Sequence, residues 1–370
     1  MSRWKTHPEE WVAGLNAGAK VGHKHHIIPK FVLRRWADPA GRLQVFSRAD
    51  SKYSTRAIAD VAVKDFYTFV ALDGSSNSTY EEFLSKVEAD AAATITWLLN
   101  PLRRTSTELT TEQRWSLDLF VGFQLVRGPR SRREIEQLAD FYGKSVSEGR
   151  IPDDVLSGLE FVTHQNDHIQ TMGERAETVA HCLHSRPARL IRLDQPLLWI
   201  SDEPVVVEHN NDTNEGHHPD CFLTKKQLRQ RAARAKKAES TEYSHVLHFR
   251  PTRRLSVLNA DAILIPLAPN IALAFGPPAP ALDLLVPDTR LDGDTAAAFA
   301  KTHNDEISSS AIDVIICPPQ DQDFNQRTMP PPTAILQVCG PKGVANAAIN
   351  EIHPRIRPRR YTKDAPPLQE

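Results

Sequence analysis

Three histidines near the amino terminus are the side chains of this chain best suited to chemistry. His23, His25 and His26 lie within four positions and precede an Ile-Ile-Pro sequence. Because imidazole titrates near neutral pH, a histidine here can serve as a general base or as a metal ligand. The structural alternative is a histidine that hydrogen-bonds and caps the start of the helix that follows.

Three more polar residues fall on the apolar faces of expected helices. Glu88 follows Leu84 by four positions, so it lies on or beside the apolar stripe of its helix, where an unpaired carboxylate is costly. It needs a cationic or hydrogen-bonding partner, or a raised pKa. Gln124 and Arg127 share a face with Phe120, which makes Arg127 the natural partner for Glu88 or for a bound anion. A purely structural network between two helices is the other interpretation.

Asp202 lies in the sequence Ser-Asp-Glu-Pro at the end of an expected strand. Such an aspartate caps a turn beside proline, or serves as a metal ligand or an acid on a rigid strand edge. His164 and His168 have the four-residue spacing of two metal ligands on one helix face. Their neighbours are polar, and a solvated helix face is the favoured interpretation.

The sequence His25-His-Ile-Ile-Pro resembles the opening of HNH-type nucleases, in which one histidine activates water and its neighbour binds the metal. Those nucleases continue through a Gly-rich turn to an asparagine and a final histidine. Here a Phe-Val-Leu-Arg-Arg-Trp sequence follows, and residues 37–100 contain no histidine. The resemblance is therefore local.

A longer resemblance begins at His26. The sequence from His26 to Trp36 is similar to the opening signature H-[YFH]-[VI]-P-x-F-x-L-[RK]-x-[FW] of a bacterial domain family of unknown function. Later blocks resemble that family in the expected order, up to about residue 317: Phe66-Tyr-Thr68, Glu88, Gln124-x-x-Arg127, Ser201-Asp202-Glu-Pro-Val205, Pro266-Leu-Ala-Pro269 and Asn304. The resemblance implies a fold and brings no established activity.

We expect five of these polar residues to converge on one pocket: His26, Glu88, Gln124, Arg127 and Asp202. A histidine, two carboxylates and an arginine suit hydrolysis of a phosphodiester. In this hypothesis His26, Glu88 and Asp202 bind a divalent metal ion of unspecified identity, and Arg127 stabilises the developing charge. The expected protein is a nuclease of the toxin or phage-defence type, with nucleic acid or another phosphate-containing ligand as partner. The alternative is a non-catalytic anion- or protein-binding module.

The elements that must position these residues indicate an α+β fold. Helical periodicity dominates residues 79–186, and short strands separated by Pro, Asp, Asn and Gly dominate residues 188–317, as in an antiparallel sheet. We expect a flexible arm over 1–22, one domain over 23–317 and a Pro/Arg-rich tail over 318–370. A polar insertion over 208–244 interrupts the strands and is the expected contact for a protein partner.

Composition excludes several classes of protein. Lys and Arg number 45 against 46 Asp and Glu, so nucleic-acid binding would depend on a local patch. No apolar run reaches the roughly 18 residues of a membrane span, and the amino terminus has no apolar signal region, so we expect a cytoplasmic protein with no membrane contact. The four cysteines form no C-x-x-C pair, which argues against a structural zinc site or a disulfide scaffold. There is no G-x-S-x-G, P-loop or G-x-G-x-x-G motif, which argues against serine hydrolases, P-loop NTPases and dinucleotide enzymes.

Overall fold

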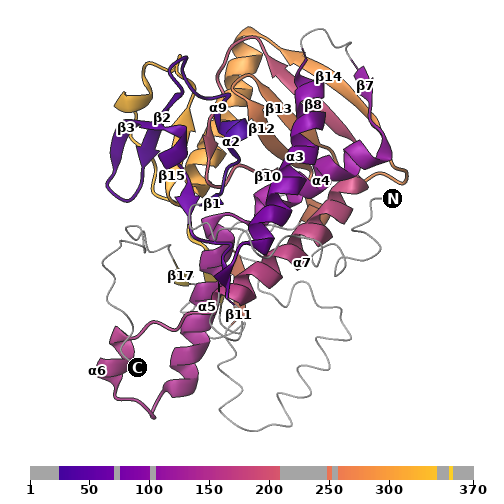
Figure 1. The fold of residues 1–370 in the computed structure, drawn as a ribbon. Helices are drawn as coiled ribbons and strands as arrows, with labels where there is room; N and C mark the ends of the chain where they lie inside the picture. Colours follow the sequence, from indigo (N-terminus) through magenta and orange to yellow (C-terminus); the bar gives the residue numbers. More distant parts are fainter. Residues whose placement is uncertain are drawn as a thin grey trace.

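The computed structural model describes residues 25–70, 76–100, 106–208, 248–251, 257–339 and 350–352. It confirms the α+β class, with helices stacked against mainly antiparallel sheets (Figure 1). The described helices are α2 Lys30–Leu33, α3 Thr79–Leu99, α4 Thr111–Val126, α5 Pro129–Ser147, α6 Asp153–Gly158, α7 Gln165–His184 and α9 Gly293–Ser310. Short 3-10 turns lie at η2 Ile58–Asp60, η6 Val257–Asn259 and η7 Phe324–Gln326.

Two larger sheets form the β part of the fold. A six-stranded sheet has the order β10-β12-β13-β8-β14-β7, and a four-stranded sheet has the order β3-β2-β15-β9. Within them, β14 and β8 are parallel and the other neighbours are antiparallel. The strands of the six-stranded sheet are β10 Val206–Glu208, β12 Ala262–Ala268, β13 Ile271–Phe275, β8 Ala188–Leu193, β14 Leu285–Leu291 and β7 Ser106–Glu108. Those of the four-stranded sheet are β3 Lys52–Ala57, β2 Arg42–Ser47, β15 Val314–Cys317 and β9 Ile200–Ser201.

Three small sheets complete the described chain. β1 His25–His26 pairs with β4 Val63–Lys64, and β5 Phe69–Val70 pairs with β6 Ser76–Asn77. The third has the order β11-β16-β17, with β11 His248–Pro251, β16 Leu336–Cys339 and β17 Asn350–Ile352.

Both faces of the larger sheet are covered, and the alternation of side chains along β13 shows how. Leu273 belongs to the main core with α3, α4 and α7, whereas Ala272 packs with Ala296 and Ala300 of α9 on the opposite face. A sheet buried on both sides explains why β13 is apolar without interruption.

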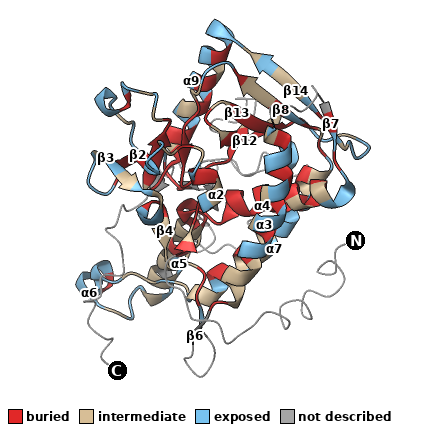
Figure 2. Ribbon diagram, turned by 45° about the horizontal axis from the view of Figure 1, so that its top comes forward, coloured by how far each residue is buried: buried red, intermediate tan, exposed pale blue. Residues whose placement is uncertain are grey.

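Helix α4 packs against both α3 and α7, and it is buried along most of its length (Figure 2). It begins with a capping box, in which Thr110 and Gln113 each bind the other's backbone N–H. Gly122 allows α7 to approach closely, because a Cβ there would lie 2.5 Å from the carbonyl oxygen of Ala176. The polar residues at the carboxyl end of α4 therefore lie within the closely packed layer that α3, α4 and α7 form.

The structure carries the packed chain past the predicted boundary at residue 317. Phe324 is buried against Trp199, and β16 pairs with β11 and β17. Apolar side chains in this Pro-rich stretch supply burial that its composition alone does not reveal. The predicted arm over 1–22 lies outside the described residues, as does nearly all of the insertion over 208–244, of which only Glu208 is described.

One further expectation changes in detail. The helical block expected over residues 79–186 also contains a strand, β7, which extends the larger sheet. No helix in the described ranges is long and apolar enough to cross a membrane.

Candidate functional site

Arg127 is held by a clamp of two polar side chains at the carboxyl end of α4. Its Nη1 donates to Oε1 of Glu88 on α3 at 2.6 Å. With its amide oxygen facing the guanidinium, Gln124 accepts from Nε at 2.9 Å and from Nη2 at 2.5 Å. The predicted Glu88–Arg127 pair is thus confirmed. Three of the five N–H groups of the guanidinium are used within the clamp, which leaves two for a further acceptor.

His26 lies near this clamp with one ring nitrogen unoccupied. Its Nε2 is 3.2 Å from the carbonyl oxygen of Ile58, which only accepts hydrogen bonds, so Nε2 carries the proton and Nδ1 is the basic atom. In the described part of the chain, Nδ1 has no hydrogen-bond partner. Burial is the main cause that lowers the pKa of His26; the Ile58 contact opposes it, and the charges of Lys30 and Arg127 lower the pKa further. A neutral imidazole with a free Nδ1 suits a general base.

The structural alternative for His26, a cap on the following helix, is not what the structure shows. Helix α2 begins after Pro29, whose position has no side-chain cap, and His26 binds the chain at Ile58 instead. His26 therefore has a different role from that of its neighbour.

His25 is the buried partner in this pair and was missed as a positioning residue. Its Nδ1 accepts from the backbone N–H groups of Phe66 and Tyr67, both at 3.2 Å, and its ring packs on Tyr67. Its Nε2 lies 3.2 Å from Oε2 of Glu81, on α3. Because successive residues of a strand face opposite sides, His25 points inward and fixes the 66–67 segment while His26 is only partly buried.

Asp202 is placed in a different network. Its Oδ1 accepts from the backbone N–H groups of Ile312 and Val314 at 3.2 and 3.4 Å, and its Oδ2 accepts from that of Asp313 at 2.7 Å. Complete burial, followed by the charge of Asp313, raises the pKa of Asp202 to about 7. Asp202 thus joins the strand end after β9 to the link between α9 and β15. It caps backbone N–H groups, as in the turn-capping interpretation, but those groups belong to a distant segment and not to its own turn.

The three predicted metal ligands are therefore not brought together as one set. Glu88 binds Arg127 through Oε1, Asp202 binds backbone amides through both carboxylate oxygens, and His26 binds the Ile58 carbonyl through Nε2. Among the described residues, no group of three or more His, Cys, Asp or Glu side chains is arranged to hold a metal ion.

Glu203, beside Asp202, has a role that sequence reasoning did not assign. Its Oε1 accepts the backbone N–H of Arg130 at 2.6 Å in the first turn of α5, so the carboxylate caps that helix. The signal was present in the Gly128-Pro129 pair that opens α5, because a Cβ at Gly128 would clash with the Glu203 carboxylate.

Substitution of Gly128 tests this cap. We expect Gly128→Ala to lower the free energy of unfolding by about 1–2 kcal/mol, because it displaces the carboxylate from the helix terminus. Gly158→Ala, at the end of α6 with no atom near its Cβ position, is the matched control and should leave stability almost unchanged. Urea denaturation of both variants measures the difference, and equal stability would disprove the capping role.

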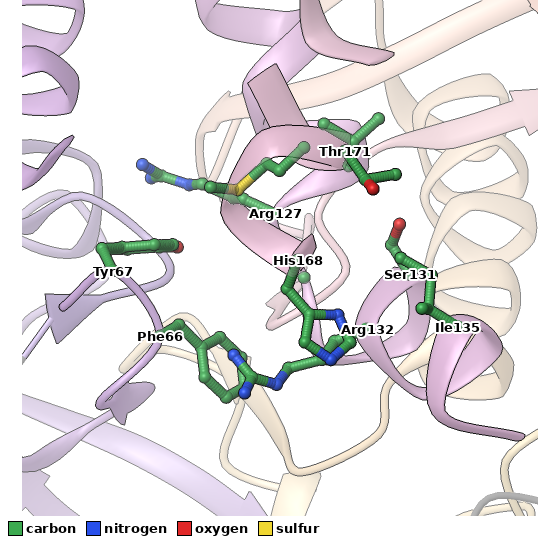
Figure 3. A pocket seen from close by; sticks show the side chains of 11 residues that line it. Phe66, Tyr67, Arg127, Ser131, Arg132, Ile135, His168 and Thr171 are labelled. Atoms are coloured by element: carbon green, nitrogen blue, oxygen red, sulfur yellow. The ribbon is translucent and has the colours of Figure 1, made fainter. Parts of the chain in front are cut away.

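A small cavity lies next to Arg127, between α4, α5 and α7 (Figure 3). Its interior volume is about 20 Å³, roughly the space of one or two water molecules. Tyr67 points its hydroxyl toward the middle of this space, and Ser131 faces it from α5. His168 also lines it, although a solvated position was expected. The side chain of His168 is buried, and its Nε2 bonds Thr163 Oγ1 at 2.7 Å.

The candidate site thus contains the Glu88–Gln124–Arg127 clamp, with His26 near it and the cavity beside it. The charge of Arg127 contributes to the pKa of both His26 and Tyr67, after the larger effect of burial in each case. This arrangement can hold an anion at Arg127 and accept a proton at His26 Nδ1.

Comparison with known proteins places the chain in a family without assigning chemistry. Residues 24–224 match the family model described as "Protein of unknown function (DUF4238)". No curated protein and no solved structure matches the chain. The matched region contains all five predicted site residues and more than half of the 370 residues. As the resemblance at His26 led us to expect, the chain belongs to the DUF4238 family of proteins of unknown function.

Proposed function

We propose that this protein hydrolyses phosphodiester bonds, as a nuclease of the toxin or phage-defence type. The observation that supports this most is the neutral His26, whose proton is fixed on Nε2 by Ile58 and whose Nδ1 lies free near the charge of Arg127. A neutral base that feels the charge of a cation suits the attack of water on a phosphate.

In the proposed reaction, Nδ1 of His26 takes a proton from water as the water oxygen bonds to phosphorus. The two N–H groups of Arg127 outside the clamp bind the non-bridging oxygens, where negative charge gathers. Breakage of the bond to the leaving oxygen follows, and protonated His26 or solvent returns a proton to that oxygen. Glu88 and Gln124 orient the guanidinium in this reaction and do not act on the phosphate.

The metal-dependent form of the proposal assigns His26, Glu88 and Asp202 as ligands of a divalent ion. It requires Asp202 to leave three backbone amides and Glu88 to share its carboxylate with Arg127. The metal-free form, in which Arg127 alone stabilises the developing charge, requires neither rearrangement. Parallel reactions with Mg²⁺, with Mn²⁺ and with EDTA separate the two.

The test is His26→Gln in a hydrolysis assay. We expect the rate on single-stranded DNA, duplex DNA or RNA to fall at least about 100-fold, because glutamine cannot take up the proton. His181→Gln, an exposed histidine on α7, is the control and should keep full activity. Equal rates for wild type and His26→Gln, or a wild type that cleaves none of these substrates, would contradict the proposal.

The second candidate is a non-catalytic module that binds an anion or a protein. The clamp favours anion binding, since Arg127 keeps two donors whether or not a reaction follows. This candidate expects tight binding of a phosphate-containing ligand without turnover by the wild-type protein.

A further inference from the structure

The cavity beside Arg127 is lined by hydrogen-bond donors within an apolar wall. Tyr67, Ser131 and Thr171 contribute hydroxyls, and the two arginines of the lining are ion-paired, Arg127 with Glu88 and Arg132 with Glu136. None of the described residues that line it carries a carboxylate. A few convergent polar groups in a mainly apolar wall are typical of ligand sites, and hydroxyl donors in a lining without a carboxylate favour an acceptor such as the oxygen of an anion.

The Tyr67 hydroxyl is the most informative of these groups. The side chain is 2% exposed, and the hydroxyl has no hydrogen-bond partner among the described residues. Burial raises the pKa of Tyr67 to about 12, an effect that Arg127 opposes, so the hydroxyl is a neutral donor at physiological pH. A buried donor without an acceptor is unfavourable for folding, and a ligand oxygen would remove that cost.

Ser131 faces the same space from the first turn of α5. Its Oγ accepts from Arg175 Nη1 at 3.5 Å, which leaves its own proton free to donate. In Figure 3 the Tyr67 and Ser131 hydroxyls approach the cavity from opposite sides.

We propose that this cavity is an oxyanion subsite. In it, the hydroxyls of Tyr67 and Ser131 donate hydrogen bonds to one or two oxygens of a phosphate group. Its interior of about 20 Å³ holds oxygens and not a whole phosphate, so the rest of the phosphate group lies outside the cavity. The inference rests on the proposed function in one respect: the phosphate bound here is that of the substrate.

Binding of inorganic phosphate to the full chain, measured by calorimetry, tests the subsite without requiring activity. We expect Tyr67→Phe to weaken binding at least about tenfold, the effect of losing one hydrogen bond to a charged acceptor. Ser131→Ala should weaken it in the same direction. Tyr80→Phe is the matched control, because its hydroxyl is also buried without a partner but does not line the cavity.

Thermal denaturation shows whether each variant folds. If Tyr67→Phe does not fold, the phosphate affinity of Ser131→Ala is the test of the subsite. Equal affinities for wild type, Tyr67→Phe and Ser131→Ala would overturn the subsite, as would a wild type that binds no phosphate in the millimolar range. A short oligonucleotide distinguishes the source of the phosphate. Competition between it and inorganic phosphate places the substrate's phosphate in the cavity, and simultaneous binding overturns that assignment.

Failure of the proposed hydrolysis has a different signature. If phosphate binding depends on Tyr67 but no substrate is cleaved, the subsite stands and the catalytic proposal falls.

Discussion

Arg114→Met is expected to lower the free energy of unfolding by at least about 5 kcal/mol. Arg114 and Asp118 are both fully buried, and Nε of the arginine donates to Oδ1 of the aspartate at 2.8 Å. The same guanidinium donates to the carbonyls of Asp283, Leu183 and Arg186 at 2.6–2.9 Å. Methionine fills the volume but leaves a buried carboxylate and three carbonyls without these donors.

The pH dependence of the variant provides a second observable. Burial raises the pKa of Asp118, and contacts with His184 and Arg114 oppose that rise. Loss of Arg114 therefore moves the folded-state pKa further above its unfolded value. The folded state then binds more protons than the unfolded state between the two values, so stability falls as pH increases through that window.

Urea denaturation of Arg114→Met from mildly acidic to neutral pH measures both effects. The double variant Arg114→Met/Asp118→Asn is the control, since it removes the buried charge and should recover part of the loss and most of the pH dependence. A single variant that loses less than the double, or a stability that rises with pH, would contradict this account of the pair.

Local patterns were enough to predict most of the fold. The helical periodicity over residues 79–186 and the short apolar runs over residues 188–317 depend on neighbouring residues, and the structure has its long helices α3, α4, α5 and α7 in the first range and β8, β12 and β13 in the second. The packing of residues 318–339 depends on contacts with distant elements, such as Phe324 on Trp199, and composition alone did not reveal it.

The same distinction between local patterns and contacts with distant elements applies to the candidate site. Glu88 and Arg127 lie on the inner faces of long helices, so their pairing followed from helical periodicity. Asp202 binds the backbone of residues 312–314, more than 100 positions away, and no spacing rule reaches that far. Tyr67 enters the cavity because buried His25 holds the 66–67 backbone, an effect of pairing between β1 and β4.

Glu88→Ala is expected to cost about 3–5 kcal/mol of unfolding free energy, and Arg127→Met clearly less. The Arg127 side chain is 1% exposed, so loss of Glu88 leaves a buried cation with only Gln124 beside it. The Glu88 side chain is 25% exposed, so after loss of Arg127 its carboxylate can turn toward water. Urea denaturation gives the order of the two losses, and the reverse order would contradict the burial argument.

The same two variants separate a scaffold from a site. If the clamp served only to join α3 and α4, function would follow stability, and Glu88→Ala would be the more damaged protein. If Arg127 binds the phosphate, Arg127→Met should lose at least about 100-fold in hydrolysis while remaining the better folded of the two. Rates measured well below the unfolding transition of both variants make the comparison, since each is then fully folded. An Arg127→Met protein with wild-type hydrolysis and wild-type phosphate affinity would show that the clamp is structural, because its cation would then contribute to folding and not to the ligand.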